Sequence, residues 1–274
     1  MRLRLMMLLL QLLLLPMWAS ASEARWEEHP EWAPEFSDRG VVGTALILDE
    51  QANRYLVFDR KRAESRFSPA STFKLFNALV ALDTGAVKDE YEVIRWDGVK
   101  RHFDNWNRDQ SLASAMKFSA VWFYQEIARR AGSLRMQGWI DKTGYGNRDI
   151  GGGIDRFWLS GQLRISAVEQ IAFLHRLAAG TLPFSARAQE TVRRISMVDS
   201  APDYVLRGKT GWAVSEDTAR ALDLGWFVGW VERGGRRWFF AINVDMPNGL
   251  VDAPKRMAIA RAVLARSGAL PASQ

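Results

Sequence analysis

Two short motifs place a hydroxyl group and amino groups where they could act together in catalysis. Ser71 and Lys74 form a Ser-x-x-Lys pattern, and Lys209-Thr210-Gly211 follows much later in the chain. A serine hydroxyl is a weak nucleophile until a base takes its proton. A lysine amine can be that base only if burial among apolar groups lowers its pKa far below the usual value of about 10.4. The first motif therefore predicts a serine nucleophile beside a buried, neutral lysine.

A structural role is the alternative for the same two residues. If a helix begins at Ser71, then Lys74 lies one turn away on the same face. Backbone N–H groups at such a helix start could hold a developing oxyanion. The serine could instead cap the helix while the lysine stays in solvent. The spacing alone allows both roles, so the surrounding sequence has to decide between them.

Both motifs occur a second time, in different surroundings. Ser114–Lys117 repeats the first motif, but no strand and proline precede it, and we interpret its lysine as a surface residue. Lys142–Gly144 repeats the second motif after a helix-like stretch and predicts a turn. By contrast, Pro69 ends a strand-like run just before the first motif. Lys209–Gly211 ends another such run, where the glycine permits close approach of backbone.

Hydrophobic patterning predicts strands near both ends of the chain. Runs 41–48 and 55–59 flank a polar stretch and indicate a hairpin. Run 204–208 leads into the Lys-Thr-Gly motif. Runs 225–231 and 238–244 flank a turn that contains two glycines, which is a strong hairpin signal.

Helical spacing recurs between these strands. Apolar residues repeat at helix period over about 71–85, 119–132, 166–180 and 254–266. The third segment opens with a Ser-x-x-Glu capping box. These elements predict an α+β fold in which a central antiparallel sheet, built from both termini, is flanked by helices and carries an inserted helical lobe over roughly 88–200. We expect the ligand site in the cleft between the sheet and this lobe.

Composition narrows the class of protein. The 274 residues are 48% hydrophobic and 25% charged, which suits one large globular domain over 22–274. The net charge is 37 − 31 = +6, but the basic residues are scattered among acids, so a nucleic-acid partner is not expected. The absence of cysteine excludes disulfides and thiolate metal sites. Both a monomer and a homodimer are compatible with the sequence.

Residues 1–21 have the pattern of a secretory signal peptide. Arg2 and Arg4 form a basic start, residues 5–15 are apolar except for one glutamine, and Ala19-Ser20-Ala21 suits a cleavage site. The alternative is a retained membrane anchor, but a span needs about 20 apolar residues. We expect cleavage, no stable membrane association, and export to a bacterial periplasm without disulfides.

Five motifs in a fixed order make the resemblance to a known family specific. In chain order they are Ser71-Thr72-Phe73-Lys74, Ser119-Ala120-Val121, Tyr145-Gly146-Asn147, Trp158-Leu159-Ser160-Gly161 and Lys209-Thr210-Gly211. This order resembles the class D serine β-lactamases, the oxacillinases, over essentially the whole mature chain. The resemblance implies a β-lactamase/transpeptidase-like fold, hydrolysis of β-lactams and antibiotic resistance.

The resemblance also implies roles for the residues of the acylation site. Ser71 would be the nucleophile that forms an acyl-enzyme. Lys74 would be carbamylated by CO2 and would serve as general base for acylation and deacylation, with no metal. Val121 and Leu159 would form the walls of the lysine pocket, and the Trp158 indole N–H would donate to the carbamate.

Proton transfer and oxyanion binding involve further residues. By the same resemblance, Ser119 and Lys209 would relay a proton to the leaving nitrogen. The backbone N–H groups of Ser71 and Trp212 would form the oxyanion hole, where each such donor is typically worth about 3 kcal/mol in the transition state.

Substrate recognition would involve the second motif and a distant arginine. Thr210 and Gly211 would contact the substrate, and Arg256 would hold its carboxylate with a bidentate guanidinium. Trp106 would form an apolar rim. The segment Ala213–Leu224, an expected hairpin loop beside the cleft, departs from the family pattern and leaves the substrate spectrum open.

Other functional classes fit the sequence less well. Penicillin-binding sensor domains share these motifs and stay acylated, but they need a membrane tether. Penicillin-binding proteins and class A enzymes carry an asparagine at the position that Val121 occupies. The histidines His29, His102 and His175 are far apart and lack the spacing of a catalytic triad or zinc site. The alternative to an enzyme is therefore a sensor-type domain that is acylated without turnover.

Overall fold

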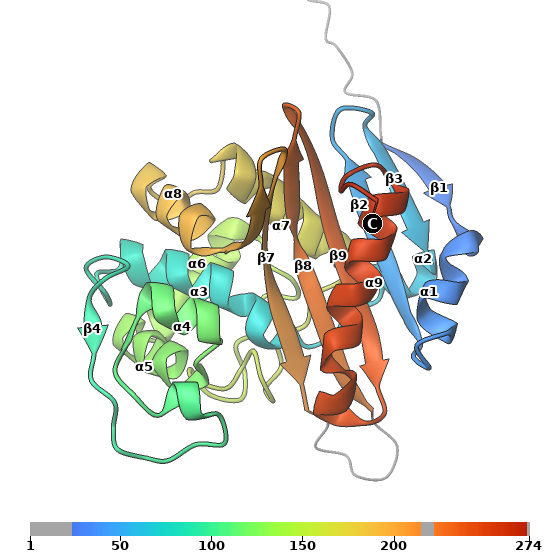
Figure 1. Ribbon diagram of the computed structural model, residues 1–274. Coiled ribbons are helices and arrows are strands. Elements are labelled where there is room, and N and C mark those ends of the chain that lie inside the picture. The colour runs from blue at the N-terminus through green and yellow to red at the C-terminus, as the bar shows by residue number, and fades with distance from the viewer. Residues whose placement is uncertain (1–23, 215–221, 273–274) are drawn as a thin grey trace, which may run out of the picture.

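A seven-stranded sheet forms the centre of the part of the chain that the computed structural model describes, residues 24–214 and 222–272 (Figure 1). The strand order is β1-β3-β2-β9-β8-β7-β6. The strands are β1 (Arg25–Glu28), β2 (Gly43–Asp49), β3 (Arg54–Phe58), β6 (Met197–Ala201), β7 (Tyr204–Ala213), β8 (Asp223–Arg233) and β9 (Arg236–Met246). The predicted signal peptide, residues 1–21, lies outside the described residues.

Strands from the two ends of the chain pair at the middle of this sheet. β2 runs antiparallel to β9, and β2 with β3 and β8 with β9 form the two expected hairpins. At the tip of the second hairpin, Gly234 and Gly235 both have positive φ, as a two-residue turn of this kind requires. The antiparallel sheet built from both termini is confirmed. One strand departs from it, because β1 pairs with β3 in parallel and makes the sheet mixed.

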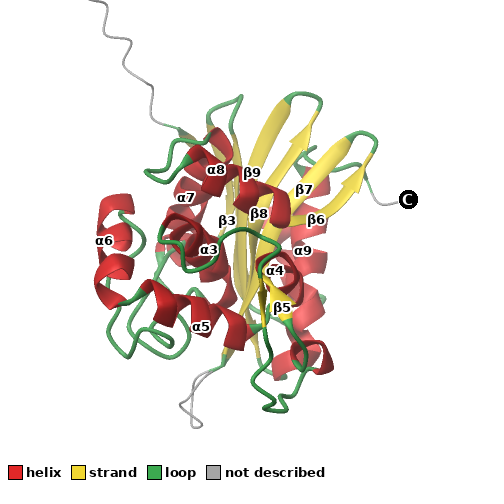
Figure 2. Cartoon of the chain, turned by 90° about the vertical axis from the view of Figure 1, so that its left-hand side faces the viewer, coloured by secondary structure: helices red, strands yellow, loops and turns green. Residues whose placement is uncertain are grey.

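Helices cover both faces of the sheet (Figures 1 and 2). The helix α9 (Ala253–Arg266) packs on one face together with the short α1 (Ala33–Ser37). On the other face lie α2, α3 and α7, and beyond them the helical lobe. Their bounds are α2 (Arg60–Glu64), α3 (Lys74–Asp83), α4 (Leu112–Phe118), α5 (Val121–Ala131), α6 (Ser133–Thr143), α7 (Ala167–Ala179) and α8 (Ala186–Ile195). Two short strands, β4 (Val93–Ile94) and β5 (Gln110–Ser111), pair within the lobe.

The apolar core has one layer on each side of the sheet. Phe227 and Ile242 face α9 and pack with Ile259. Trp226 faces the other way and joins the larger core, which includes Phe76 of α3. Because neighbouring strand residues point to opposite faces, the near-continuous apolar runs of β8 and β9 supply both layers.

The structure corrects several expected boundaries. The helix expected from Ser71 begins with a 3-10 turn, η2 (Ala70–Phe73), and becomes α-helical at Lys74. The second Ser-x-x-Lys copy lies in α4, a helix that the sequence did not predict because it is only two turns long. β7 does not end at Lys-Thr-Gly but continues through it to Ala213. The predicted capping box of α7 is present, with Ser166 accepting from the Glu169 backbone N–H.

Candidate active site

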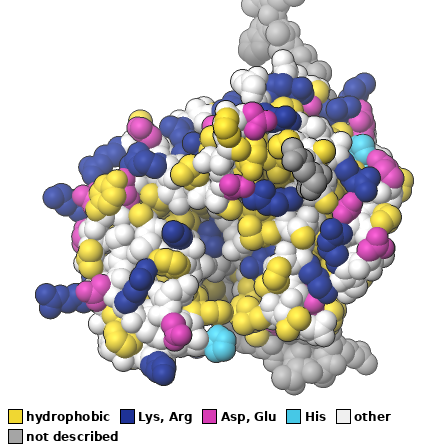
Figure 3. Space-filling view, in the orientation of Figure 1, with side chains coloured by type: hydrophobic (Ala, Val, Ile, Leu, Met, Phe, Trp, Pro, Cys, Tyr) yellow, Lys and Arg dark blue, Asp and Glu magenta, His cyan; other side chains and the backbone are white. Residues whose placement is uncertain are grey.

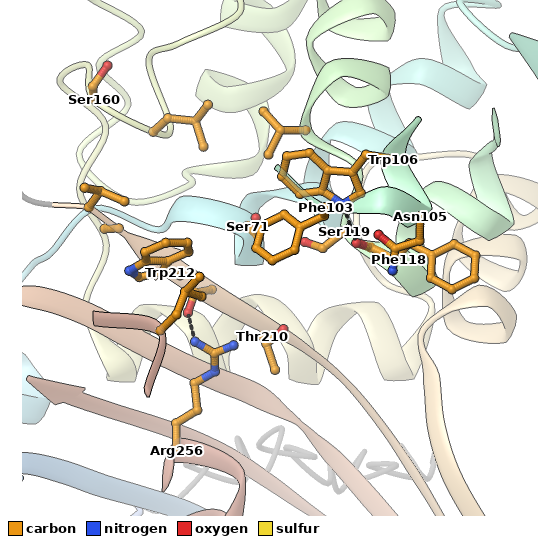
Figure 4. A pocket seen from close by; sticks show the side chains of 16 residues that line it. Ser71, Phe103, Asn105, Trp106, Phe118, Ser119, Ser160, Thr210, Trp212 and Arg256 are labelled. Carbon is orange, nitrogen blue, oxygen red and sulfur yellow. Dashed lines mark hydrogen bonds between the residues drawn. The ribbon is translucent and has the colours of Figure 1, made fainter. Parts of the chain in front are cut away.

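A cavity of about 580 Å³ opens between the end of β7 and the helical lobe (Figure 4). In Figure 3 the molecule is hollowed between the lobe on the left and the sheet on the right. Nine of the residues predicted for the site line this cavity: Ser71, Trp106, Ser119, Val121, Leu159, Thr210, Gly211, Trp212 and Arg256. They come from six separate segments of the chain that meet at one place.

The turn that carries Ser71 is fixed by contacts on both sides. The residue before it, Ala70, has φ +46°, a left-handed conformation that costs energy for a residue with a side chain. Trp226 of β8 donates its indole N–H to the Ser68 carbonyl at 3.0 Å. Ser68 Oγ in turn donates to the Leu159 carbonyl at 3.0 Å. Sheet and lobe therefore both hold the turn in place.

The glycine of Lys-Thr-Gly is explained by how closely this turn approaches β7. A Cβ atom at Gly211 would lie 3.0 Å from the Pro69 carbonyl oxygen and 3.1 Å from Thr72 Cγ2. The backbone carbonyl leaves little room to adjust. Gly211 therefore allows the Ser71 turn to pack directly against the strand.

Lys74 lies beside Ser71 in a dry environment. Its Nζ atom is 2.5 Å from Ser71 Oγ, and the side chain is completely buried. The Tyr124 ring lies 5.4 Å from Nζ. Burial lowers the pKa of Lys74 well below its ordinary value, and the charge of Lys209 lowers it further. The amine is therefore held in the neutral form that a base requires.

Trp158 places an unused hydrogen-bond donor in the same region. Its ring stacks on Phe73, the residue before Lys74, with 5.4 Å between ring centroids. Trp158 Nε1 is buried, and it finds no acceptor among the residues that the structure describes. A buried donor without a partner costs about 1–3 kcal/mol, so this site suits an added acceptor oxygen. A carbamate on Lys74 would offer such an oxygen, and the residues present fit that group.

The Tyr-Gly-Asn motif fixes the loop that carries Trp158 and Leu159. Asn147 Oδ1 accepts from the Arg164 backbone N–H at 2.9 Å, and Asn147 Nδ2 donates to the Gln162 carbonyl at 2.9 Å. Gly146 has φ +54°, and a Cβ there would lie 2.3 Å from the Arg164 carbonyl oxygen. The motif shapes this loop and lies outside the cavity.

The free edge of β7 offers backbone N–H groups to the cavity. The Gly208 N–H donates to Ser196 beside β6 at 2.8 Å, so it points to the β6 side of the strand. Every second residue of a strand points its N–H to the same side, so the N–H groups of Thr210 and Trp212 also point to the β6 side. β6 pairs no further than Arg207, and these groups therefore face the cavity. Ser119, in a left-handed conformation with φ +57° at the end of α4, lies on the opposite wall.

Lys209 lies on β7 beside Thr210 and next to a second cavity. Its Nζ donates to the carbonyl and hydroxyl oxygens of Thr210, at 3.0 and 3.3 Å. It lines a second cavity, of about 620 Å³, together with Met116 and Phe227. Burial, together with the charge of Arg256, lowers the pKa of Lys209 to about 7. The lysine can thus change protonation state near neutral pH, and the relay with Ser119 stays a prediction.

Arg256 brings a positive charge to the cavity from the far face of the sheet. It donates to the Gly211 carbonyl at 3.0 Å, and burial lowers its pKa to about 10. Within residues 24–214 and 222–272 it forms no ion pair with an acid, so its charge is available to an anionic ligand. On the opposite rim, Trp106 Nε1 donates to the Phe118 carbonyl at 2.9 Å, which fixes the ring.

Sequence reasoning missed several residues of the cavity wall. Phe103, Asn105, Phe118 and Leu250 all line it, whereas Val214, which also lines it, belongs to the segment expected beside the cleft. Phe103 precedes the short 3-10 helix η3 (Asp104–Trp106), and Leu250 lies in the short 3-10 helix η4 (Gly249–Asp252). Segments of three or four residues carry no periodic pattern that indicates which way a side chain points.

Two further findings concern the described residues only. No cluster of three or more histidine, aspartate or glutamate side chains there could hold a metal ion. No helix in these ranges is long and apolar enough to span a membrane.

Comparison with known proteins identifies the family and the fold. Residues 43–265 match the family model of the penicillin binding protein transpeptidase domain. The chain is 42% identical to β-lactamase OXA-2 of Salmonella typhimurium over 99% of this chain and 96% of that protein. It is 42% identical to β-lactamase OXA-48 of Klebsiella pneumoniae, with 90% and 91% covered. The crystal structure of FUS-1 (OXA-85), a class D β-lactamase from Fusobacterium nucleatum, superimposes with a TM-score of 0.84 at 38% identity, covering 89% of this chain and all of that one.

The transpeptidase-type fold and the serine–lysine site first define a penicillin-binding enzyme. The identity over nearly the whole chain then narrows this class, and the chain belongs to the class D β-lactamases, which are serine β-lactam hydrolases.

Proposed function

We propose that this protein hydrolyses β-lactams through an acyl-enzyme on Ser71, with Lys74 carbamylated by CO2 as the general base of both steps, and that it thereby confers β-lactam resistance. The observation that carries the proposal is the 2.5 Å separation of Ser71 Oγ and Lys74 Nζ in a fully buried environment. A charged lysine would be costly there, and a neutral amine is the form that reacts with CO2.

The surroundings of Lys74 suit the modified side chain. When bound as a carbamate on Nζ, CO2 supplies a basic oxygen that can accept a proton from a hydroxyl group or water. Trp158 Nε1 would hold that group, since the indole N–H lacks another acceptor among the described residues. Val121 and Leu159 line the cavity with apolar surface, which keeps bulk water away from the amine.

The remaining residues bind and orient the substrate. The backbone N–H groups of Ser71 and Trp212 would hold the oxyanion as Ser71 Oγ bonds to the lactam carbonyl carbon and the C–N bond then breaks. Ser119 and Lys209 would deliver a proton to the leaving nitrogen. Thr210 and Arg256 would bind the substrate carboxylate by charge-assisted hydrogen bonds, and Trp106 would pack against an apolar part of the substrate.

We also propose that the protein acts in the periplasm after export through residues 1–21. The basic start, apolar stretch and small-residue cleavage site of this segment support the proposal.

The test is turnover of a chromogenic cephalosporin by the purified protein and by Lys74→Ala. We expect many turnovers per enzyme for the natural chain. The variant should release at most one equivalent and then stop, because it lacks the base for deacylation. A single burst from the natural chain would instead support a sensor-type domain, and unchanged turnover by Lys74→Ala would contradict the role of the lysine.

A further inference from the structure

Arg256 has to cross the sheet to reach the cavity. It lies on α9, on the face away from the helical lobe, yet its guanidinium donates to Gly211 of β7 at 3.0 Å (Figure 4). The β8 residue opposite Trp212 in the strand register is Gly225. Paired residues share a face of the sheet, so Gly225 lies on the path of the arginine side chain.

Gly225 leaves room that a side chain would occupy. A Cβ atom there would lie 3.3 Å from Arg256 Cδ and 2.4 Å from Met246 Sδ. Met246 is only 1% exposed, so its side chain has little space into which to retreat. Its sulfur also lies 3.9 Å from Arg256 Nη1, so any displacement of Met246 affects the arginine.

The backbone itself does not require a glycine at this position. Gly225 lies inside a regular strand and is not among the residues with positive φ. Most residues adopt strand geometry, and glycine weakens it. The space that it leaves is therefore the physical reason for glycine here.

We propose that Gly225 is a positioning residue for substrate binding, because its missing side chain leaves the channel through which Arg256 reaches the substrate carboxylate. The inference rests on the proposed role of Arg256. A methyl group at position 225 would displace the guanidinium by a few tenths of an ångström or more. Hydrogen bonds to charged groups weaken when their geometry is disturbed.

Steady-state kinetics of Gly225→Ala test this inference. We expect KM for a β-lactam with a free carboxylate to rise about tenfold, as partial loss of a charged hydrogen bond predicts, while kcat stays within about threefold. For the methyl ester of the same β-lactam, KM should be the same in the variant and the natural chain. The matched control is Gly138→Ala on α6, where a Cβ meets nothing within 4 Å, and we expect no change in either constant.

Comparison of Arg256→Ala with the double variant Arg256→Ala/Gly225→Ala decides the cause, and it does not require the single variant Gly225→Ala, which could be too unstable to purify. Removing the arginine also frees the space, so adding Gly225→Ala to that variant should change KM by less than about twofold. An additional tenfold rise, or an equal effect on the ester, would overturn the role of Gly225. If the natural chain fails to turn over β-lactams at all, the proposed function fails instead, so the two failures are distinguishable.

Discussion

At the scale of single residues, the site depends on two lysines that the fold removes from water. Lys74 is fully buried and Lys209 is 6% exposed, and burial lowers the pKa of both. An ammonium group loses favourable hydration in such a place, and neither lysine has an acid as a hydrogen-bond partner in the described residues. Keeping these lysines buried therefore lowers the free energy of unfolding, a cost in stability.

That cost predicts a pH-dependent gain in stability for Lys74→Met. The pKa of Lys74 is lower in the folded than in the unfolded chain, so between these two values the unfolded chain binds more protons and unfolding free energy rises with pH. In CO2-free buffer we expect the variant to be more stable at pH 7 by about 1–4 kcal/mol, with a smaller difference near pH 10. Denaturant unfolding between pH 6 and 10 measures this.

The exposed Lys117 supplies the control for this measurement. Lys117→Met should change stability by less than about 0.5 kcal/mol at every pH, as is usual for surface positions. A difference between Lys74→Met and the natural chain that stays constant with pH would show that the titration of Lys74 is not its cause.

At the scale of elements, the side chain of Asn147 helps to hold the loop that carries Trp158. Asn147 makes two side-chain hydrogen bonds to the far end of this loop, at Gln162 and Arg164. Irregular segments have few backbone partners of their own, so such side-chain bonds determine their conformation. The position of the Trp158 indole thus depends on a residue outside the cavity.

Asn147→Ala should therefore loosen the Lys74 pocket, although Asn147 lies outside the cavity. We expect a loss of about 1–3 kcal/mol in stability, because two hydrogen bonds are lost, one of them part-buried. Activity should also need more added bicarbonate to reach its maximum, since Trp158 would hold the modified lysine less firmly. Turnover titrated with bicarbonate measures this.

Asn147→Asp serves as the partial control, because the carboxylate keeps the acceptor for Arg164 and loses only the donor to Gln162. We expect a smaller change in the bicarbonate requirement. Equal bicarbonate dependence in the natural chain and both variants would contradict a link between this loop and the lysine.

At the scale of the whole molecule, the parts with strong apolar patterns were predictable and the irregular parts were not. β2 is buried at every residue, so its apolar run indicated a strand without ambiguity. β6 is mostly exposed and, as an edge strand of the sheet, pairs only with β7, so its sequence carries no periodic signal. Segments around Phe103 and Leu250 reach the cavity through tertiary contacts alone. The position of Lys209 also depends on which way β7 faces, which the motif does not encode.

The order of motifs predicted the pocket better than any single motif did. Both decoy copies lie away from it, the Ser-x-x-Lys copy in α4 and the Lys-Thr-Gly copy at the end of α6. The correct copies meet because the Ser71 turn packs on Gly211 of β7. A short motif often occurs by chance, whereas the same motif in the matching structural context rarely does.

Export is a property of the whole chain and gives a prediction of its own. If residues 1–21 form a cleaved signal, their deletion should abolish β-lactam resistance in a Gram-negative host, while the purified protein keeps its turnover. Mass spectrometry of the secreted natural protein should find a start near Ser22. Resistance that persists after the deletion, or an uncleaved chain in the membrane fraction, would contradict this expectation.

The glycine turn between β8 and β9 has a practical consequence. Gly234 and Gly235 are exposed, and a Cβ at either position would meet no other atom within 4 Å. β8 runs from Asp223 to Arg233, the residue before this turn, which is ten residue steps or roughly 33 Å at about 3.3 Å per step. An anchoring group attached at this tip would tether the enzyme to an electrode or bead with the opening of the active-site cavity turned toward the sample. The scaffold thus offers a ready attachment point for a β-lactam biosensor.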